Sequence, residues 1–402
     1  MTVQSLSAES HATRHHVQEI TIHTDSREIL ANARRDAEKY NLSDYFIVDV
    51  DSHHVELDSW AEVLDNIENP VLRHTAHSMM RDWPYPVALS NFRPGLTFQD
   101  VGGRIPHQAR LAEPVDVSDG RHRNLTLVDR AMETMGIDIQ VVFPQPMLEI
   151  GLHPSPEIAT ELIFAYNRWF CDRILQHGPK LRALIALPFS DPAACIRTVE
   201  EFADKPGVIG FLVTSQRHEG VQSAAYMPLY RMLEERGLPI GFHAGPDFAV
   251  AKSMNRFLSV HAMSFATCNM IHLANWVING LPERFPKLKV IWIESGLAWI
   301  SFLMQRLDHE FLMRQSDAPL LKRLPSEYMR EMFYTSQPLE VTNVKLLEAT
   351  FEAINAETQL LWASDWPHWD FDTPGRIAAL PFMTKPMLRN ILGENAKCLF
   401  KL

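Results

Sequence analysis

Several carboxylate and imidazole side chains stand where short buried strands of this sequence are expected to end. The most prominent are Asp51, His53, His243 and Asp365. Because side chains alternate along an extended chain, Asp49, Asp51 and His53 share one face of the first strand, and charge buried there needs a partner or a metal ion. Oxygen and nitrogen donors without thiolates suit zinc, manganese or iron. We therefore expect these side chains to hold one or two divalent ions.

Further donors lie near these positions and could complete the site. They are Glu56, Glu294, His261, His272 and His368. With them, the chain has enough donors for a second metal ion. Asp365, Glu294 and His368 are also the candidate catalytic residues, because a carboxyl group or an imidazole can carry a proton during a reaction.

Each of these further donors also has a structural interpretation. Glu56 is placed equally well to cap a helix that follows it. His272 lies in the helix-like segment 266–280, where packing is the commoner role of a histidine. For His261, a role as a metal ligand and a purely structural role are equally compatible with the sequence. His368 lies in the loop after the last strand, so we expect it to reach the pocket beside the metal or the substrate.

Eight short apolar runs bounded by turn residues recur along the chain, as expected of strands. They span 46–51, 139–144, 182–188, 207–213, 238–243, 288–294, 332–336 and 360–364. Helix-like segments alternate with most of them, for example 155–178 and 226–237, as a parallel sheet requires. Eight alternations predict a closed (β/α)8 barrel, the TIM barrel. An open doubly wound sheet is the competing fold, but the first strand lacks the glycine-rich turn usual there.

A barrel would explain why the donors belong together, because its catalytic groups come from the carboxyl ends of the strands and the loops after them. Outside this pattern, residues 1–45 read as an N-terminal arm with a helix over 26–40. The barrel domain follows over 46–402. Within it, residues 54–138 form a long insertion after the first strand, placed where it could cover the active site.

Length and composition fit one large globular enzyme domain. The 402 residues are 46% hydrophobic and 22% charged, with no apolar run long enough to span a membrane. The net charge of −11 argues against nucleic acid as a partner and favours a small-molecule substrate. The four scattered cysteines disfavour a thiolate zinc site. The first residues lack the apolar core of a secretory signal, so we expect a cytoplasmic protein.

Five segments of the chain resemble the amidohydrolase-related proteins of the aminocarboxymuconate-semialdehyde decarboxylase type. They are VDVDSHHVE at 48–56, GLPIGFHAG at 237–245, RFPKLKVIWIESGLAWI at 284–300, LLWASDWPHWDFDTP at 360–374 and ILGENAKCLF at 391–400. The resemblance implies a (β/α)8 barrel with a divalent metal. It places the metal ligands of the family on Asp51, His53 and His243, and on Asp365, which can also shuttle a proton.

One residue departs from the pattern of the decarboxylases. Glu294 stands where they carry a histidine on the sixth strand that is thought to assist the reaction. Under the resemblance, Glu294 becomes either a substituted acid or base, or an additional metal ligand. The decarboxylase mechanism therefore cannot be carried over whole.

Three functions remain open. The first is metal-dependent hydrolysis or decarboxylation of a small carboxylated substrate, with Asp365 handling a proton. The second is hydroxylation of a small amino or carboxylic acid by a dinuclear iron or manganese/iron monooxygenase, with Glu56 or Glu294 as an extra ligand. The third is a non-catalytic homologue that stabilises an active partner subunit. We favour the first by a small margin, and expect a homo-oligomer or a hetero-oligomer with a homologous subunit.

Overall fold

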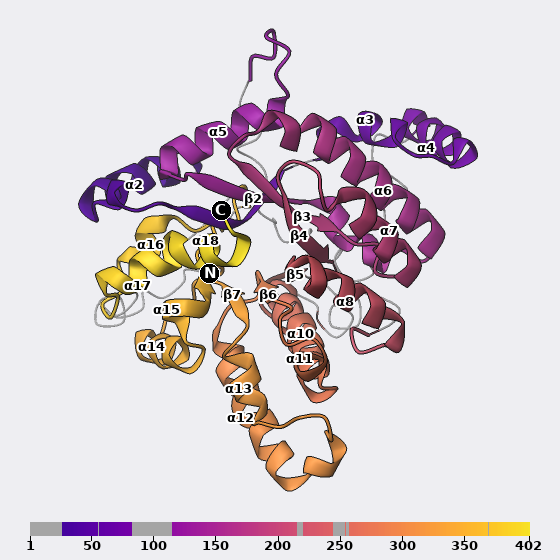
Figure 1. The fold of residues 1–402 in the computed structure, drawn as a ribbon. Coiled ribbons are helices and arrows are strands. Elements are labelled where there is room, and N and C mark those ends of the chain that lie inside the picture. The colour runs from indigo at the N-terminus through magenta and orange to yellow at the C-terminus, as the bar shows by residue number, and fades with distance from the viewer. Residues whose placement is uncertain are drawn as a thin grey trace, which may run out of the picture.

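Eight parallel strands form one sheet in the order of the sequence, β1 to β8, in a computed structural model that describes residues 26–54, 56–82, 115–214, 220–243, 254, 257–368 and 370–402. The strands are β1 Val48–His54, β2 Ile139–Pro144, β3 Leu181–Ala186, β4 Val208–Val213, β5 Ile240–His243, β6 Val290–Ile293, β7 Phe333–Thr335 and β8 Leu360–Leu361. Each neighbouring pair is parallel, and helices surround the sheet (Figure 1). The predicted (β/α)8 barrel is confirmed, and each predicted run contains or overlaps its strand.

Main-chain hydrogen bonds join the two ends of this nearly closed barrel. Strand β8 is short, so the contact to β1 is made mostly by the segment that follows β8. Val50 N donates to Trp362 O at 3.0 Å, and Asp365 N donates to Asp51 O at 2.7 Å. The carboxyl end of β1 and the segment that follows β8 are therefore held side by side by the backbone itself.

The helices lie on the outside of the barrel, and most follow the strand with which they alternate (Figure 1). They are α2 Ser26–Lys39, α3 Trp60–Asp65, α4 Pro70–Asp82, α5 Arg123–Met135, α6 Pro156–Arg173, α7 Pro192–Phe202, α8 Met227–Arg236, α10 Phe257–Ile278, α11 Leu281–Arg284, α12 Ala298–Met313, α13 Pro325–Met329, α14 Val344–Ala353, α15 Ala356–Gln359, α16 Pro374–Ala378, α17 Lys385–Arg389 and α18 Asn395–Phe400. Several begin with a side-chain cap, such as Asp191, which accepts from the first amides of α7. The predicted alternation of strand and helix is confirmed.

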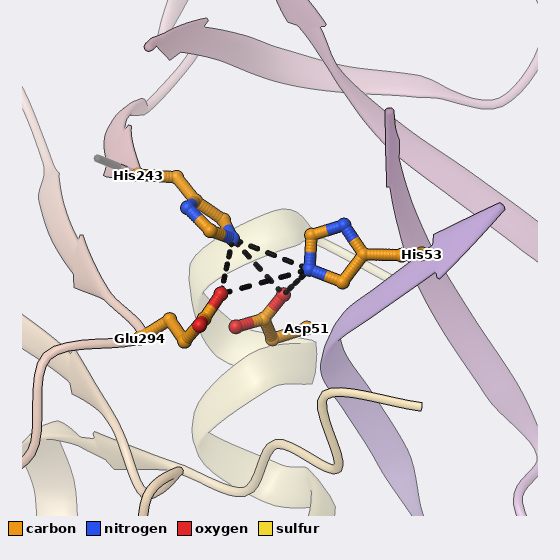
Figure 2. Close-up of side chains that lie close together, drawn as sticks. All are labelled: Asp51, His53, His243 and Glu294. Carbon is orange, nitrogen blue, oxygen red and sulfur yellow. Dashed lines mark hydrogen bonds and ion pairs between the residues drawn. The ribbon is translucent and has the colours of Figure 1, made fainter. Parts of the chain in front are cut away.

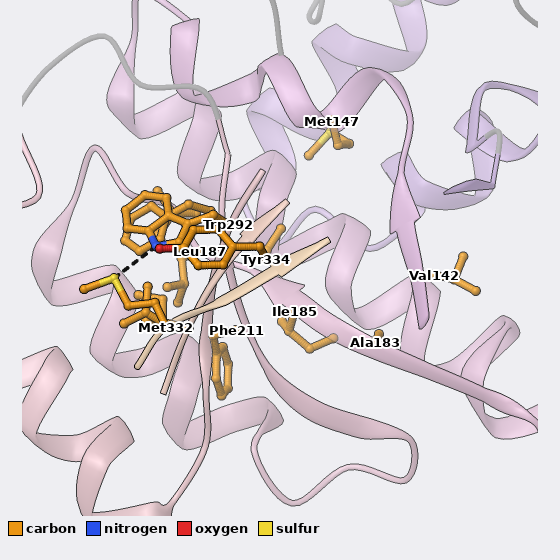
Figure 3. Packing of buried hydrophobic residues seen from close by; sticks show 14 of the residues in the cluster. Val142, Met147, Ala183, Ile185, Leu187, Phe211, Trp292, Met332 and Tyr334 are labelled. Atoms are coloured by element: carbon orange, nitrogen blue, oxygen red, sulfur yellow. Dashed lines mark hydrogen bonds between the residues drawn. The ribbon is translucent and has the colours of Figure 1, made fainter. Parts of the chain in front are cut away.

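Alternation along the strands divides the core into two apolar layers. Inside the barrel, Leu184, Leu212 and Ile293 pack together in one cluster. The opposite faces of the same strands, with Ile185 and Trp292 among them, pack against the helices (Figure 3). This two-sided burial explains why the strands appear in the sequence as continuous apolar runs.

One glycine shows how tightly the interior is filled. A Cβ at Gly241 on β5 would lie 2.8 Å from the Leu184 side chain and 2.9 Å from that of Ile293. No larger residue fits there without displacing a neighbour. The barrel is therefore a packed core, and its chemistry must occur at the strand ends.

Two predicted segments lie partly within the described residues. Helix α2 of the expected arm packs against α5 and α16 (Figure 1). In the expected insertion, α3 packs against α6 and α4 packs against α3. The division into an arm, an insertion and a barrel domain stays a prediction, as does the covering role of the insertion. Residues 1–25 and 83–114 lie outside the described part of the chain. Among the described helices, none is long and apolar enough to cross a membrane.

Candidate metal centre

Four side chains from three strands meet at the carboxyl end of the barrel (Figure 2). Asp51 and His53 lie on β1, His243 is the last residue of β5, and Glu294 directly follows β6. Together they form a buried group whose potential ligand atoms all lie within 4.8 Å of one another. The alternation of side chains on β1 places Asp51 and His53 on the same face, as the sequence predicts.

The two imidazoles point their Nε2 atoms at the centre of this group (Figure 2). These atoms are 3.3 Å apart. Nε2 of His53 lies 3.4 Å from Asp51 Oδ1, and Nε2 of His243 lies 2.9 Å from Glu294 Oε2. Four nitrogen and oxygen atoms thus converge on one point from different directions.

A second group overlaps the first. His53, Glu294, Asp365 and His368 also bring one ligand atom each within 4.8 Å of the others. Asp365 Oδ1 lies 3.1 Å from His53 Nε2 and contacts Nδ1 of His368 on its other side. Because His53 and Glu294 belong to both groups, six donors form one continuous cluster.

His53 is oriented by the neighbouring strand. Its Nδ1 lies 3.0 Å from the carbonyl oxygen of Pro144, the last residue of β2. A carbonyl can only accept, so Nδ1 carries a proton, and Nε2 is the nitrogen that faces the cluster and would bind a metal ion. This arrangement is typical of metal-binding histidines, whose second nitrogen donates to a backbone carbonyl or carboxylate. Burial lowers the pKa of His53, but hydrogen bonds to Asp365, Asp51 and Glu294 outweigh it and raise that pKa well above its usual range in the metal-free protein.

Glu294 is held in a backbone conformation that ordinary residues avoid. Its φ angle is 45°, in the left-handed region, which costs roughly 1–2 kcal/mol for a residue with a Cβ. Its amide donates to Thr335 Oγ1 on β7. Asn269 on α10 donates to Ile293 O on one side and Ser295 Oγ on the other. These bonds hold the segment so that the Glu294 side chain turns into the barrel mouth.

Asp365 has the same unusual backbone, with a φ angle of 61°. Its amide donates to Asp51 O, and its carbonyl accepts from the amide of His368 at 2.9 Å. The next amide, that of Trp366, donates to Ser364 Oγ. Strained backbone at two facing site residues is expected where a structure fixes functional groups at a cost in stability.

The protein itself satisfies the carboxylate oxygens of the cluster only in part. Both oxygens of Asp51 are buried with no hydrogen-bond partner in the described structure, whereas Oε2 of Glu294 is in ion-pair contact with His243 Nε2 at 2.9 Å. Burial lowers the pKa of His243, but the charges of Asp51 and Glu294 outweigh it and raise that pKa to about 9. Burial and the charge of Glu294 raise the pKa of Asp365 well above its usual range. A divalent cation fits these donors, because it would satisfy the unpaired oxygens and neutralise the buried charge.

Asp49 faces the same way along β1 but has partners of its own. Its carboxylate is fully buried and accepts from Ser364 N at 2.8 Å, Ser364 Oγ at 2.6 Å, Gln140 Nε2 at 2.9 Å and Asp51 N at 3.2 Å. The expectation that a metal satisfies Asp49 together with Asp51 and His53 is therefore wrong. Instead, Asp49 ties β1 to β2 and to the segment before Asp365.

The structure does not bring three of the predicted donors into the cluster. Both oxygens of Glu56 accept from backbone amides, those of Gln145 and Met147. His272 faces Cys268 Sγ at 3.4 Å within α10. His261, also on α10, lies 3.8 Å from a carboxylate oxygen in the loop after β8. A metal-ligand role for these three therefore has no geometric support in the described structure.

Reasoning from the sequence missed residues that contact the cluster from neighbouring loops. Gln145, just after β2, contacts Nε2 of His368 through its Oε1. Ser364 binds Asp49 and the amide of Trp366. Neither residue type is a typical ligand, and their partners are far away in the sequence. The available signal was their position at the ends of expected strands, Gln145 just after 139–144 and Ser364 at the end of 360–364.

Comparison with known proteins agrees with this geometry. A family model described as amidohydrolase matches residues 121–402. The chain belongs to this amidohydrolase family. It is therefore an enzyme of the amidohydrolase superfamily, and its buried cluster suits a divalent metal ion. The resemblance inferred from the sequence is confirmed.

Solved structures with the same fold include three decarboxylases. The 5-carboxyvanillate decarboxylase of Sphingomonas paucimobilis is 20% identical, with a TM-score of 0.65 over 89% of this chain and 99% of that one. A dihydroxybenzoic acid decarboxylase from Polaromonas, crystallised with manganese and 2-nitroresorcinol, is 19% identical, with a TM-score of 0.62 over 89% and 97%. The 5-carboxyvanillate decarboxylase of Novosphingobium aromaticivorans, also with manganese, is 17% identical, with a TM-score of 0.64 over 90% and 97%.

Proposed function

We propose that this enzyme removes the carboxyl group of a small carboxylated aromatic compound with the help of a divalent metal ion. The observation that carries the proposal is the cluster at the barrel mouth, where the buried carboxylates of Asp51 and Glu294 converge with Nε2 of His53 and of His243. Support for the reaction class comes from relatives of the same fold, which are named as decarboxylases of hydroxylated benzoates. Two of them were crystallised with manganese, which makes Mn²⁺ the first ion to test.

The residues that would hold the ion are Asp51, His53, His243 and Glu294, which form one group, with Asp365 of the overlapping group as a further carboxylate donor. When bound, such an ion supplies a Lewis acid that polarises a substrate oxygen and offsets negative charge. The chain supplies the rest of the site. It keeps the donors dry, since all five are buried, and the strand ends fix their directions.

Asp365 is the residue that would carry the proton. It lies between His53 and His368, at the edge of the cluster. In the proposed step its carboxyl group donates a proton to the ring carbon that bears the substrate carboxylate. The new C–H bond forms as the C–C bond breaks, the electron pair of that bond returns to the ring, and carbon dioxide leaves. Asp365 then regains a proton from water for the next turnover.

His368 would take the place of the histidine that the decarboxylases carry on the sixth strand. At that position this chain has Glu294, whose Oε2 is engaged with His243 at 2.9 Å. His368 approaches the cluster from the loop after β8 instead and contacts Asp365 directly. An imidazole beside the proton carrier is thus kept, although it comes from a different strand.

Carbon dioxide release from defined substrates tests this proposal. The Mn²⁺-loaded enzyme is incubated with 2,6-dihydroxybenzoate and with 5-carboxyvanillate, and substrate loss and carbon dioxide are measured against Asp365→Asn. We expect release of carbon dioxide in equal amount to the loss of at least one substrate, and none with the variant. Hydrolysis of esters or lactones without any decarboxylation, by an enzyme with the same metal requirement, would contradict the proposal and favour the hydrolase.

A second candidate has one specific observation in its favour. The two donor groups overlap at His53 and Glu294, and such an arrangement could hold two ions for hydroxylation with oxygen. The comparisons favour neither this function nor a non-catalytic subunit, and Glu56 is occupied by backbone amides. Two ions per chain together with oxygen-dependent turnover would establish this candidate. A single ion and turnover unchanged without oxygen would exclude it.

A further inference from the structure

We propose that Gln145 is a positioning residue that holds His368, and through it Asp365, with Glu56 as the anchor of the loop that carries Gln145. The inference rests on the proposed metal centre only in that Asp365 is taken as one of its ligands. It gives Glu56 and Gln145, which bind no metal in this account, a defined task in the site.

Glu56 fixes the backbone of the loop after β2. Its carboxylate is fully buried, and Oε2 accepts from Gln145 N while Oε1 accepts from Met147 N, each at 2.9 Å. A carboxylate that receives one amide on each oxygen cannot rotate without losing both bonds. The start of the connection between β2 and α6 is therefore held against the segment that follows β1.

Gln145 extends from this clamped backbone to His368. Its Oε1 accepts from Nε2 of His368, while Nδ1 of the same ring contacts Asp365 Oδ1. The ring also packs on His53, with centroids 4.4 Å apart. Both nitrogens of His368 are thus engaged from opposite sides, which fixes the plane of the ring.

The consequence reaches Asp365. Its Oδ1 is shared between His368 and His53, so the orientation of the carboxylate depends on the orientation of both rings. His53 is fixed independently through Pro144 O. For His368, the side-chain oxygen of Gln145 has the role that the Pro144 carbonyl has for His53. The last residue of β2 and the residue that follows it therefore orient one imidazole each.

A double-mutant cycle on Mn²⁺ affinity tests this dependence without any substrate. Gln145→Met removes the acceptor and keeps the length of the side chain, and His368→Phe removes the ring nitrogens. Each single change should weaken Mn²⁺ binding roughly 10-fold or more, as loss of such outer contacts usually does. The double variant should bind no worse than the weaker single variant, because Gln145 acts only through His368.

Two further variants separate positioning from general damage. Gln145→Glu keeps an acceptor oxygen and should retain more Mn²⁺ affinity than Gln145→Met. Gln359→Met makes the same substitution in α15, where the side-chain amide donates to Arg330 O outside the cluster, and should leave affinity unchanged. Thermal unfolding of the metal-free proteins verifies that each variant folds.

The positioning role of Gln145 would be overturned if the two losses of Mn²⁺ affinity multiply in the double variant. Unchanged Mn²⁺ affinity in Gln145→Met would overturn it as well. Wild-type protein that does not bind Mn²⁺, Zn²⁺ or Fe²⁺ would contradict the metal centre itself. Because affinity is the readout, failure to decarboxylate any benzoate leaves the result of the cycle valid.

Discussion

Replacement of Ser364 by alanine perturbs the contact between β1 and the segment that follows β8, where the two ends of the barrel meet. The Ser364 hydroxyl is fully buried, donates to the Asp49 carboxylate at 2.6 Å and accepts from Trp366 N at 2.9 Å. Alanine removes both bonds and leaves the backbone otherwise unchanged. The segment affected leads directly into Asp365, so the change tests how this joint supports the site.

The expected loss of stability follows from these two bonds. A hydrogen bond to a charged group contributes roughly 1.5–3 kcal/mol, and a buried amide left without an acceptor costs about 1–3 kcal/mol. Their sum is on the order of 4 kcal/mol. With an unfolding entropy of about 2.1 cal/mol/K per residue, a chain of this length has roughly 0.8 kcal/mol/K at its Tm. The Tm of Ser364→Ala should therefore fall by about 5 °C.

Calorimetry of the metal-free proteins checks this value against a matched control. Ser264 is equally buried, on α10, and its hydroxyl has no hydrogen-bond partner in the described structure. Ser264→Ala makes the same chemical change without breaking a bond, so its Tm should stay within about 1 °C of the wild type. Equal Tm values for the two variants would refute the role assigned to Ser364.

Three other predictions concern charge at the site. Glu294→Gln removes one carboxylate donor and should weaken Mn²⁺ binding roughly 10-fold or more by calorimetric titration, whereas unchanged affinity would show that Glu294 is not a donor. Asp365→Asn should lower kcat for carbon dioxide release by at least about 100-fold, and retained turnover would assign the proton to another group. Burial raises the pKa of Asp49 and of Glu56 to about 7. The folded state then binds protons that the unfolded state releases, so the metal-free protein should lose stability as pH rises from about 4 to about 7. Roughly 3 pKa units for Asp49 correspond to about 4 kcal/mol, and a smaller pH dependence is expected in Asp49→Asn. A Tm that rises over this range would contradict the assignment.

The barrel could be predicted from the sequence because its strands are buried on both faces. Such strands appear as short continuous apolar runs, and the carboxyl ends of all eight must meet at one end of the barrel. This rule alone places Asp51, His53, His243 and Glu294 together, although up to 243 residues separate them. Position at a strand end was sufficient to predict that these four residues lie close together.

Local pattern failed where the chain leaves the strands. Glu56 follows His53 by three residues, but the chain enters a 3-10 turn at Glu56–Ser59, and the carboxylate meets the loop after β2 instead of the metal site. Helix α10 begins at Phe257, earlier than predicted, because its faces are all largely apolar and no helical periodicity marks its start. His272 lies within it, facing Cys268.

Contacts that join distant loops were also beyond the sequence. Asp49 looks like another ligand by alternation, and only the structure shows that Ser364 and Gln140 satisfy it. The contact of Gln145 with His368 joins loops after β2 and β8. Neither residue type indicates such a role, because glutamine and serine form hydrogen bonds throughout proteins.

Metal content of the purified protein shows whether the carboxylates and imidazoles at the barrel mouth hold a divalent ion. Wild type and the variant Asp51→Asn/His243→Ala are prepared without added metal, and Mn, Fe and Zn per chain are determined by elemental analysis. We expect at least one tightly held divalent ion per wild-type chain and its loss from the folded double variant. Equal metal content in the two proteins, or a wild-type chain that neither contains nor takes up a divalent ion, would contradict it.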